Sequence, residues 1–544
     1  MSAGMRILVL GIWGLVIASR GAIAQHEQHG GGTPEEELGT VHFVTSCDGS
    51  VEKDFDRAVA LVHSFWFSEA IEGFQTVLQK DAGCAMAGWG IALGWWSNPF
   101  GAFRSAQALA EGSAAIERAK AANAPTERER DYIAAVELLY KDAGTLDQRT
   151  RTLAYEKAME NLAAKHPEDP EARIFYALAL DQTALPTDKT YQNQLKAAAI
   201  LEKEFESQPD HPGIAHYIIH SYDTPALAPR ALDAARRYAE IAPAAPHALH
   251  MPSHTFTRLG YWQESIESNI ASAEAARKDG AATEELHALD YQVYAYLQTA
   301  QDQAAREVLD AVPSIASRIV MSGPGVAAPP PAGIFAAAAI PARFTIERNG
   351  WADAAALVPR ESPFPWADAV TYFARGLGAA RNGNSAAAVK DVEKLTALRD
   401  ALEQAKDAYW SEQVEIQRHV TLAWIAFAEG RKDEALVMMR EAADMEDATE
   451  KSAVTPGPIK PARELLGEML LEAGRPADAL TEFELTVTKE PNRFRGIHGA
   501  ARAAMLAGDP AKAETYYAKL LEICERADQP GRPELEEARK AAGP

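Results

Sequence analysis

Similar residues recur at a spacing of 34 along this chain of 544 residues, and this repeat constrains its fold more than any other feature. A repeat of this length is typical of a unit built from two short helices. One such unit cannot bury its own apolar face, so successive units have to stack on one another. The sequence therefore predicts an all-α solenoid of antiparallel helix pairs. The step is also visible in two pairs of histidines: His216/His220 and His250/His254.

The C-terminal repeats indicate how each unit is built. Gly474 falls in the turn between two helices, Ala479 is small enough for close helix contact, and Phe483 fills the gap. These positions return one step later as Gly508, Ala513 and Tyr517. The pattern resembles the tetratricopeptide repeat (TPR) family, close to its consensus at Leu466, Gly467, Gly474, Ala479, Phe483 and Pro491. The resemblance covers most of residues 50–526 and implies a TPR-like superhelical solenoid.

Proline and glycine interrupt the helical pattern in the middle of the chain. Residues 321–333 contain four prolines and three glycines, which cannot continue a helix. We therefore expect N-terminal repeats at residues 41–320, a linker at 321–333 and C-terminal repeats at 334–544. Whether the two sets of repeats stack continuously stays open. A second interruption lies at residues 455–461. It falls between Gly430 and Gly474, which are 44 residues apart instead of 34, and accounts for the additional residues.

The first residues have the pattern of a secretory signal. Arg6 precedes a mostly apolar run, and Ala22-Ile23-Ala24 is typical of a cleavage site. We expect residues 1–24 to be removed, with no membrane span left after cleavage, because the apolar run is short and interrupted by glycine. Residues 25–40 would then be a flexible tether. These features predict a periplasmic or secreted protein.

Charge and cysteine content add two further predictions. A net charge of −23 argues against a nucleic-acid partner, which needs a basic stripe. The chain has three cysteines, which in an exported protein indicates one disulfide and one remaining thiol. Cys47 and Cys84 are the expected pair, since each precedes a helical stretch near the N-terminal end, and Cys524 is expected to be a buried free thiol.

Histidines are concentrated in one stretch of the chain. Residues four apart lie one turn above each other on one face of a helix, so each repeated pair presents two imidazoles together. In the next unit, His287 occupies the place of His247, while Asp290 and Tyr294 replace the histidine pair. Residues 216–287 hold six of the 14 histidines: His216, His220, His247, His250, His254 and His287.

The TPR resemblance places these residues on the first helix of each unit, which lines the concave wall of the superhelix. The side chains would then converge on one ligand-binding groove. The expected groove residues are the six histidines together with Asp223, Arg258, Asp290 and Tyr294.

A metal site is one interpretation of this groove. Two imidazoles one helical turn apart can hold zinc, copper or iron, and two such pairs offer four ligands. With His247 and His287 six ligands would be available, enough for two metal ions. Asp223 and Asp290 would then be ligands, or acceptors that fix the histidine tautomers.

Two other interpretations use the same histidines without a metal. They would satisfy buried polar groups or recognise a partner's carboxylates, or, beside Arg258, they would bind an anion more strongly below about pH 6.5. No Walker loop, nucleophile elbow, dinucleotide fingerprint or zinc-protease motif occurs in the sequence, so catalysis stays undecided.

The sequence at residues His216–Asp223 and His247–His254 resembles that of a group of exported bacterial TPR proteins. This resemblance implies the fold but not the chemical function. The first hypothesis is an exported binding protein whose groove takes a protein, peptide or small ligand. The alternative is a metalloprotein or metal-dependent enzyme that uses His216/His220 and His250/His254 of adjacent repeats.

Overall fold

The computed structural model describes residues 1, 37–101, 104–323 and 325–541. Throughout these residues the secondary structure is helical, with no strand. The predicted signal peptide and residues 25–36 of the predicted tether lie outside the described residues. Among the helices that are described, none combines the length and the apolar character that crossing a membrane would need.

The predicted all-α fold of antiparallel helix pairs, a TPR-like solenoid, is confirmed. The helices before the proline-rich linker are α1 (Glu52–His63), α2 (Phe67–Lys80), α3 (Ala85–Trp96), α4 (Ala106–Ala121), α5 (Glu127–Tyr140), α6 (Gln148–Lys165), α7 (Pro170–Thr183), α8 (Gln192–Ser207), α9 (Pro212–Ser221), α10 (Leu232–Ile241), α11 (Pro246–His250), α12 (Pro252–Leu259), α13 (Trp262–Lys278), α14 (Ala282–Gln298) and α15 (Asp302–Ala316). Two short 3₁₀ helices accompany them: η1 (Gly49–Val51) and η2 (Ala228–Ala231).

The helices after the linker continue the same alternation. They are α16 (Pro330–Ile346), α17 (Trp351–Ala355), α18 (Pro365–Arg381), α19 (Ser385–Gln404), α20 (Ala408–Ala428), α21 (Lys432–Asp447), α22 (Ala462–Glu472), α23 (Pro476–Lys489), α24 (Phe494–Leu506), α25 (Pro510–Ile523) and α26 (Pro533–Ala541).

Each helix packs against the next one along the chain, as in α13 with α14 and α18 with α19. The first helices of successive units also contact one another, so that α9 touches α7 and α12, and α14 touches α11 and α12. This second set of contacts matters for function. It brings the helices that carry the clustered histidines into one neighbourhood.

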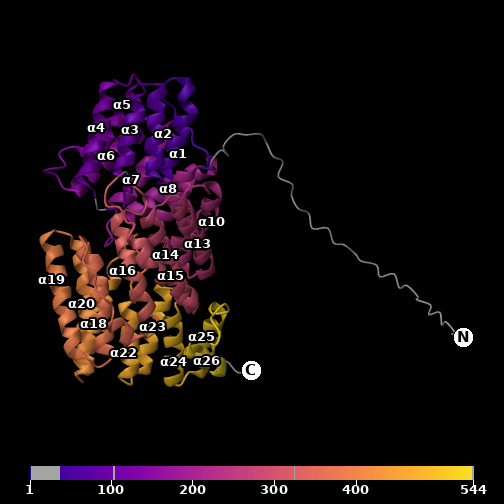
Figure 1. Ribbon diagram of the computed structural model, residues 1–544, viewed down its shortest axis with the longest axis vertical. Helices are drawn as coiled ribbons and strands as arrows, with labels where there is room; N and C mark the ends of the chain where they lie inside the picture. The colour runs from indigo at the N-terminus through magenta and orange to yellow at the C-terminus, as the bar shows by residue number, and fades with distance from the viewer. Residues whose placement is uncertain (2–36, 102–103, 324, 542–544) are drawn as a thin grey trace. The chain divides into compact units, whose positions relative to one another are not determined.

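The linker between the two sets of repeats is packed. Asn98 donates a hydrogen bond to the carbonyl oxygen of Ala327 (2.6 Å), and the Ala327 amide donates to Glu284 (2.9 Å). Helix α16 lies beside α14 and also contacts α15 (Figure 1). Residues on either side of the linker therefore share one packed core.

Residues 37–40, the described part of the predicted tether, are also packed. Leu38 is buried, and the Thr40 amide donates to the carbonyl oxygen of Asp210 (2.9 Å). Gly39 has a φ of 78°, and a Cβ there would lie 2.6 Å from the Asp210 oxygen, so only glycine fits. The described residues 37–40 of the predicted tether are thus packed rather than flexible.

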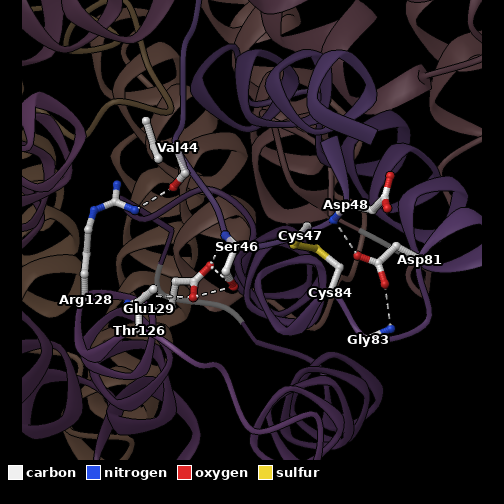
Figure 2. The surroundings of a disulfide bond; sticks show 10 residues. All are labelled: Val44, Ser46, Cys47, Asp48, Asp81, Gly83, Cys84, Thr126, Arg128 and Glu129. Carbon is white, nitrogen blue, oxygen red and sulfur yellow. Dashed lines mark hydrogen bonds between the residues drawn. A yellow bond between two sulfur atoms is a disulfide. The ribbon is translucent and has the colours of Figure 1, made fainter. Parts of the chain in front are cut away.

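Cys47 and Cys84, the pair expected from the sequence, form a disulfide that joins the segment before η1 to the start of α3 (Figure 2). Asp81 supports the same corner by accepting hydrogen bonds from the amides of Asp48 (2.9 Å) and Gly83 (3.0 Å). Cys524 is a buried free thiol, and burial raises its pKa to about 12.

Candidate metal centre

The six clustered histidines form two triads. Within each triad one nitrogen atom from every ring lies within 4.8 Å of the others. The first triad comes from α9 and α11, and the second from α11, α12 and α14. The first triad is His216, His220 and His247; the second is His250, His254 and His287.

Five of the six side chains are buried, and His220 is half-buried. The expectation that all six line a ligand-binding groove is therefore corrected for the five buried rings, whereas His220 lines a cavity. The first helices of neighbouring units pack directly on one another, so the rings meet inside the core. Each ring nitrogen of the clustered histidines should have a partner, because a buried polar atom without one costs about 1–3 kcal/mol of stability.

In the second triad, Asn269 fixes the tautomer of His250. The Asn269 side-chain nitrogen donates to the carbonyl oxygen of Ser265 (2.7 Å), which turns its oxygen toward His250. That oxygen lies 2.7 Å from Nδ1 of His250 and can only accept. Nδ1 of His250 therefore carries the proton, and Nε2 is a bare lone pair.

Asp223 does the same for His254. Its carboxylate lies 2.9 Å from Nδ1 of His254 and also accepts from Arg258 (2.9 Å) and Lys451 (3.0 Å). Burial raises the pKa of Asp223, but the charges of Lys451 and Arg258 outweigh it and hold that pKa well below its usual range. The ionised carboxylate only accepts, so Nε2 of His254 is bare as well.

The two bare nitrogens face each other. Nε2 of His250 and Nε2 of His254 are 3.1 Å apart, with both protons held on the far side of the rings. Two lone pairs at this distance cannot hydrogen-bond to each other. Ligand nitrogens about 2.0–2.1 Å from a tetrahedral metal ion are about 3.3 Å apart, so the spacing of the two nitrogens is close to that of two ligands of one metal ion. Acceptors that orient histidines in this way are the usual second layer of a metal site.

The first triad repeats only part of this geometry, because the described hydrogen bonds fix the proton of His216 but not that of His220, so Nε2 of His220 can donate to Nε2 of His216. The carbonyl oxygen of His63 accepts from Nδ1 of His216 (2.7 Å), and Nε2 of His216 lies 3.1 Å from Nε2 of His220. The third member of each triad offers a buried nitrogen without a hydrogen-bond partner, Nε2 in His247 and Nδ1 in His287. Each triad therefore has at least one buried ring nitrogen without a hydrogen-bond partner.

The histidines of the cluster are uncharged at neutral pH. Burial lowers the pKa of His216 and of His287 to about 3. Burial also lowers the pKa of the other four histidines, and the neighbouring imidazoles add to the effect in His220, His247 and His250. The rings are neutral at neutral pH, which is the form that binds metals.

The two triads are neighbours, and aromatic rings enclose them. Ring centroids are 6.1 Å apart for His220 and His254, and 5.9 Å apart for His247 and His250. Tyr291 packs 4.8 Å from both His250 and His254. Phe65 packs 4.4 Å from His216, and its φ of 55° is unusual for a residue other than glycine. Two bound ions would share one enclosed chamber.

A third group, His63, Glu171 and His211, also has metal-ligand composition but lacks the open nitrogens. Both histidines bond to Glu171 through Nε2 at 3.0 Å. Nδ1 of His63 lies 2.9 Å from the Tyr217 hydroxyl, and Nδ1 of His211 accepts from the Ile214 amide. Every ring nitrogen is satisfied, so this group serves packing.

Two residues expected in the groove lie elsewhere. Asp290 pairs with Arg343 (2.9 Å), and the Tyr294 hydroxyl accepts from Arg493 (2.8 Å). One helical turn separates them, and both point into the junction with α16 and α24 rather than toward the histidines. Asp223 and Arg258 do lie at the cluster.

Three contributors had no signal in the sequence. Asn269 is on α13, the second helix of its unit, and the carbonyl of His63 comes from the end of α1. Lys451 belongs to the irregular segment between α21 and α22, 228 residues from its partner Asp223. No repeat period relates these positions to the histidines.

Comparisons with known proteins give distant structural similarity alone. No family model matches the chain, and no curated protein matches it. A tetratricopeptide repeat protein from Parabacteroides merdae is similar in structure at 14% identity and a TM-score of 0.28, over 55% of this chain and 98% of that one. Human IFIT1, solved as a dimer with m7Gppp-AAAA, is similar at 14% identity and a TM-score of 0.34, over 78% and 87%. The likeness to these helical-repeat proteins says nothing of what this chain binds.

Proposed function

We propose that this protein is a metalloprotein whose helical repeats hold two metal ions side by side, one in each histidine triad. The observation that carries this proposal is the pair of bare Nε2 atoms of His250 and His254, 3.1 Å apart in the core. Their protons are held away by acceptors that cannot donate. A cation between the two nitrogens would bind both lone pairs, which otherwise face each other without a proton between them.

The ligand set favours copper or zinc over iron. All six ligands are imidazoles, which suit copper and zinc, and neither triad includes a carboxylate of the kind that completes the common non-haem iron site. Three protein ligands leave a coordination position open on each ion. An open position distinguishes a reactive metal site from a structural one, which is usually closed by four protein ligands.

The burial of five of the six histidines supports this proposal over the protein or peptide partner named in the first hypothesis. A partner chain cannot reach rings that are packed between helices, whereas a metal ion can. The exclusion of nucleic acid as a partner stays a prediction from the net charge.

We also propose that the protein works in an oxidising compartment, the periplasm or outside the cell. The Cys47–Cys84 disulfide supports this location, since such bonds persist mainly in exported proteins. The signal-like pattern of residues 1–24 is the second support.

Metal analysis of untagged protein tests the function. After loading with copper or zinc and extensive dialysis, we expect two ions per chain in the wild type. His216→Gln/His220→Gln and His250→Gln/His254→Gln should each keep one ion, and the fourfold variant none. His419→Gln, which replaces a half-exposed histidine outside the cluster, is the matched control and should keep two. Wild-type protein that retains no metal, or a fourfold variant that still holds two ions, would falsify the proposal.

A further inference from the structure

A cavity of about 490 Å³ reaches the first triad at His220. His220 lines this cavity and is half-buried, whereas the other five histidines are buried. The volume lies in the range of sites that enclose small molecules. Any molecule in the cavity would therefore lie next to the ion held by the first triad.

Aromatic side chains from distant parts of the sequence line this cavity. Trp366 on α18 and Trp410 on α20 stack face to face, with centroids 4.2 Å apart and planes 7° from parallel. On another part of the wall, Phe100 stacks on His220 at 4.2 Å. Phe364 and Tyr409 also line the cavity, and Trp410 is half-buried. Flat apolar walls of this kind suit a planar ring, which gains from stacking on aromatic faces.

Lys451, the lysine in the cavity lining, is already paired. Lys451 bonds to Asp223 at 3.0 Å, and Asp223 also accepts from Arg258. Burial lowers the pKa of Lys451 to about 8. An anionic ligand would therefore find no free lysine as a counter-charge here. A neutral ligand with one small polar group fits better, because a lining of this type fixes orientation through a few polar contacts.

We propose that this cavity binds a small neutral aromatic molecule, of one or two fused rings with a hydroxyl group, and presents that hydroxyl to the metal ion beside His220. The ring would lie among Phe100, Trp366 and Trp410. The direction of the hydroxyl rests on the proposed function, since the open coordination position belongs to the first-triad ion. The ring-binding part rests on the cavity alone.

Calorimetric titration with 2-naphthol tests the cavity. We expect binding to the wild type and at least tenfold weaker binding to Trp410→Leu, which removes the stacking face, and to Ala453→Phe, which fills the cavity from its wall. Tyr261→Leu changes an exposed aromatic residue that is not part of the lining, and it should bind like the wild type. Undetectable binding of 2-naphthol by the wild type would overturn the proposal. Binding by Trp410→Leu and Ala453→Phe that is as tight as binding by the wild type would overturn it as well.

Metal content measured on the same samples separates the two proposals. Wild-type protein that binds 2-naphthol in a Trp410-dependent manner but holds no metal would retain the cavity site and overturn the metal centre. Wild-type protein that holds two ions but does not bind 2-naphthol would retain the metal centre and overturn the cavity site. In the metal-loaded protein, 2-methoxynaphthalene should bind at least tenfold more weakly than 2-naphthol, and equal affinity would overturn the orientation toward the metal.

Discussion

The proton on each site histidine is placed by one neighbouring acceptor, and Asn269 is the simplest of these to remove. In Asn269→Leu, Nδ1 of His250 loses the oxygen that now lies 2.7 Å away, so the proton can move to Nε2 and block the ligand position. We expect the second triad to bind its ion about 10–100-fold more weakly, as is usual when such an acceptor is lost. Competition with a chelator measures this affinity.

The first triad is an internal control for this variant, because Asn269 does not contact it. Its ion should be held as in the wild type. Equal weakening of both ions would mean that Asn269→Leu acts through the fold, and unchanged affinity at the second triad would contradict the role assigned to Asn269.

Glu284 makes stability depend on pH in a way that one substitution can remove. Burial raises its pKa to about 7 from an ordinary value of 4.5, although its carboxylate accepts from the Ala327 amide. The folded chain thus holds a proton that the unfolded chain releases, so this group stabilises the fold most below about pH 4.5. Its contribution falls as the pH rises to about 7 and then stays constant.

Glu284→Gln keeps an acceptor for Ala327 but does not ionise. We expect the variant to exceed the wild type in free energy of unfolding by about 1–3 kcal/mol at pH 8, with the difference fading near pH 4.5. Denaturant titrations at the two pH values measure it. Glu267→Gln, at an exposed position on α13, is the control and should not show this pH dependence. A difference that grew toward low pH would contradict the assignment.

The 34-residue register predicted the helices better than it predicted the site. It placed both histidine pairs on the first helices of adjacent units, where α9, α11 and α12 carry them. It failed at Asp290 and Tyr294, because the register gives the helix and the turn but not the partner that a side chain meets. Arg343 and Arg493 come from α16 and from the start of α24, and no repeat predicts those partners.

Arg343 joins helix α14 to helix α16 and to the irregular segment after α21. The buried guanidinium donates to Asp290 (2.9 Å), to Thr455 (2.7 Å) and to the carbonyl oxygens of Gly457 (2.9 Å) and Pro458 (2.8 Å). Replacing it by methionine leaves the Asp290 carboxylate buried without its charge partner. We expect Arg343→Met to lose about 3–5 kcal/mol of unfolding free energy, measured by chemical denaturation.

A second variant shows what the Arg343 network holds in place. In Arg343→Met/Asp290→Leu no charge is left unpaired, so most of the lost stability should return. The segment at residues 451–458 would still lack its anchor and should exchange its amide hydrogens faster than in the wild type. A double variant no more stable than Arg343→Met would show that the buried ion pair does not account for the loss.

The disulfide and the metal centre are connected through the first repeat. The Cys47–Cys84 bond (Figure 2) joins residues 37 apart in sequence and closes a loop around α1 and α2. Helix α1 ends at His63, whose carbonyl orients His216. Cross-links of this size contribute about 3–4 kcal/mol by restricting the unfolded chain. We expect Cys47→Ala/Cys84→Ala to unfold first in α1–α3, seen as faster amide exchange there, and to bind the first-triad ion more weakly.

The same variant should hold the second-triad ion as the wild type does, because His250, His254 and His287 take their acceptors from α13, from Asp223 and from the backbone of Val454. Cys524→Ala, which removes the free thiol, controls for the loss of a cysteine. If both ions weakened together, the chain would open as one unit. Selective loss at the first triad would instead show that each metal ion depends on the stability of the repeats that supply its ligands, as expected for a protein in which each unit contacts mainly its neighbours.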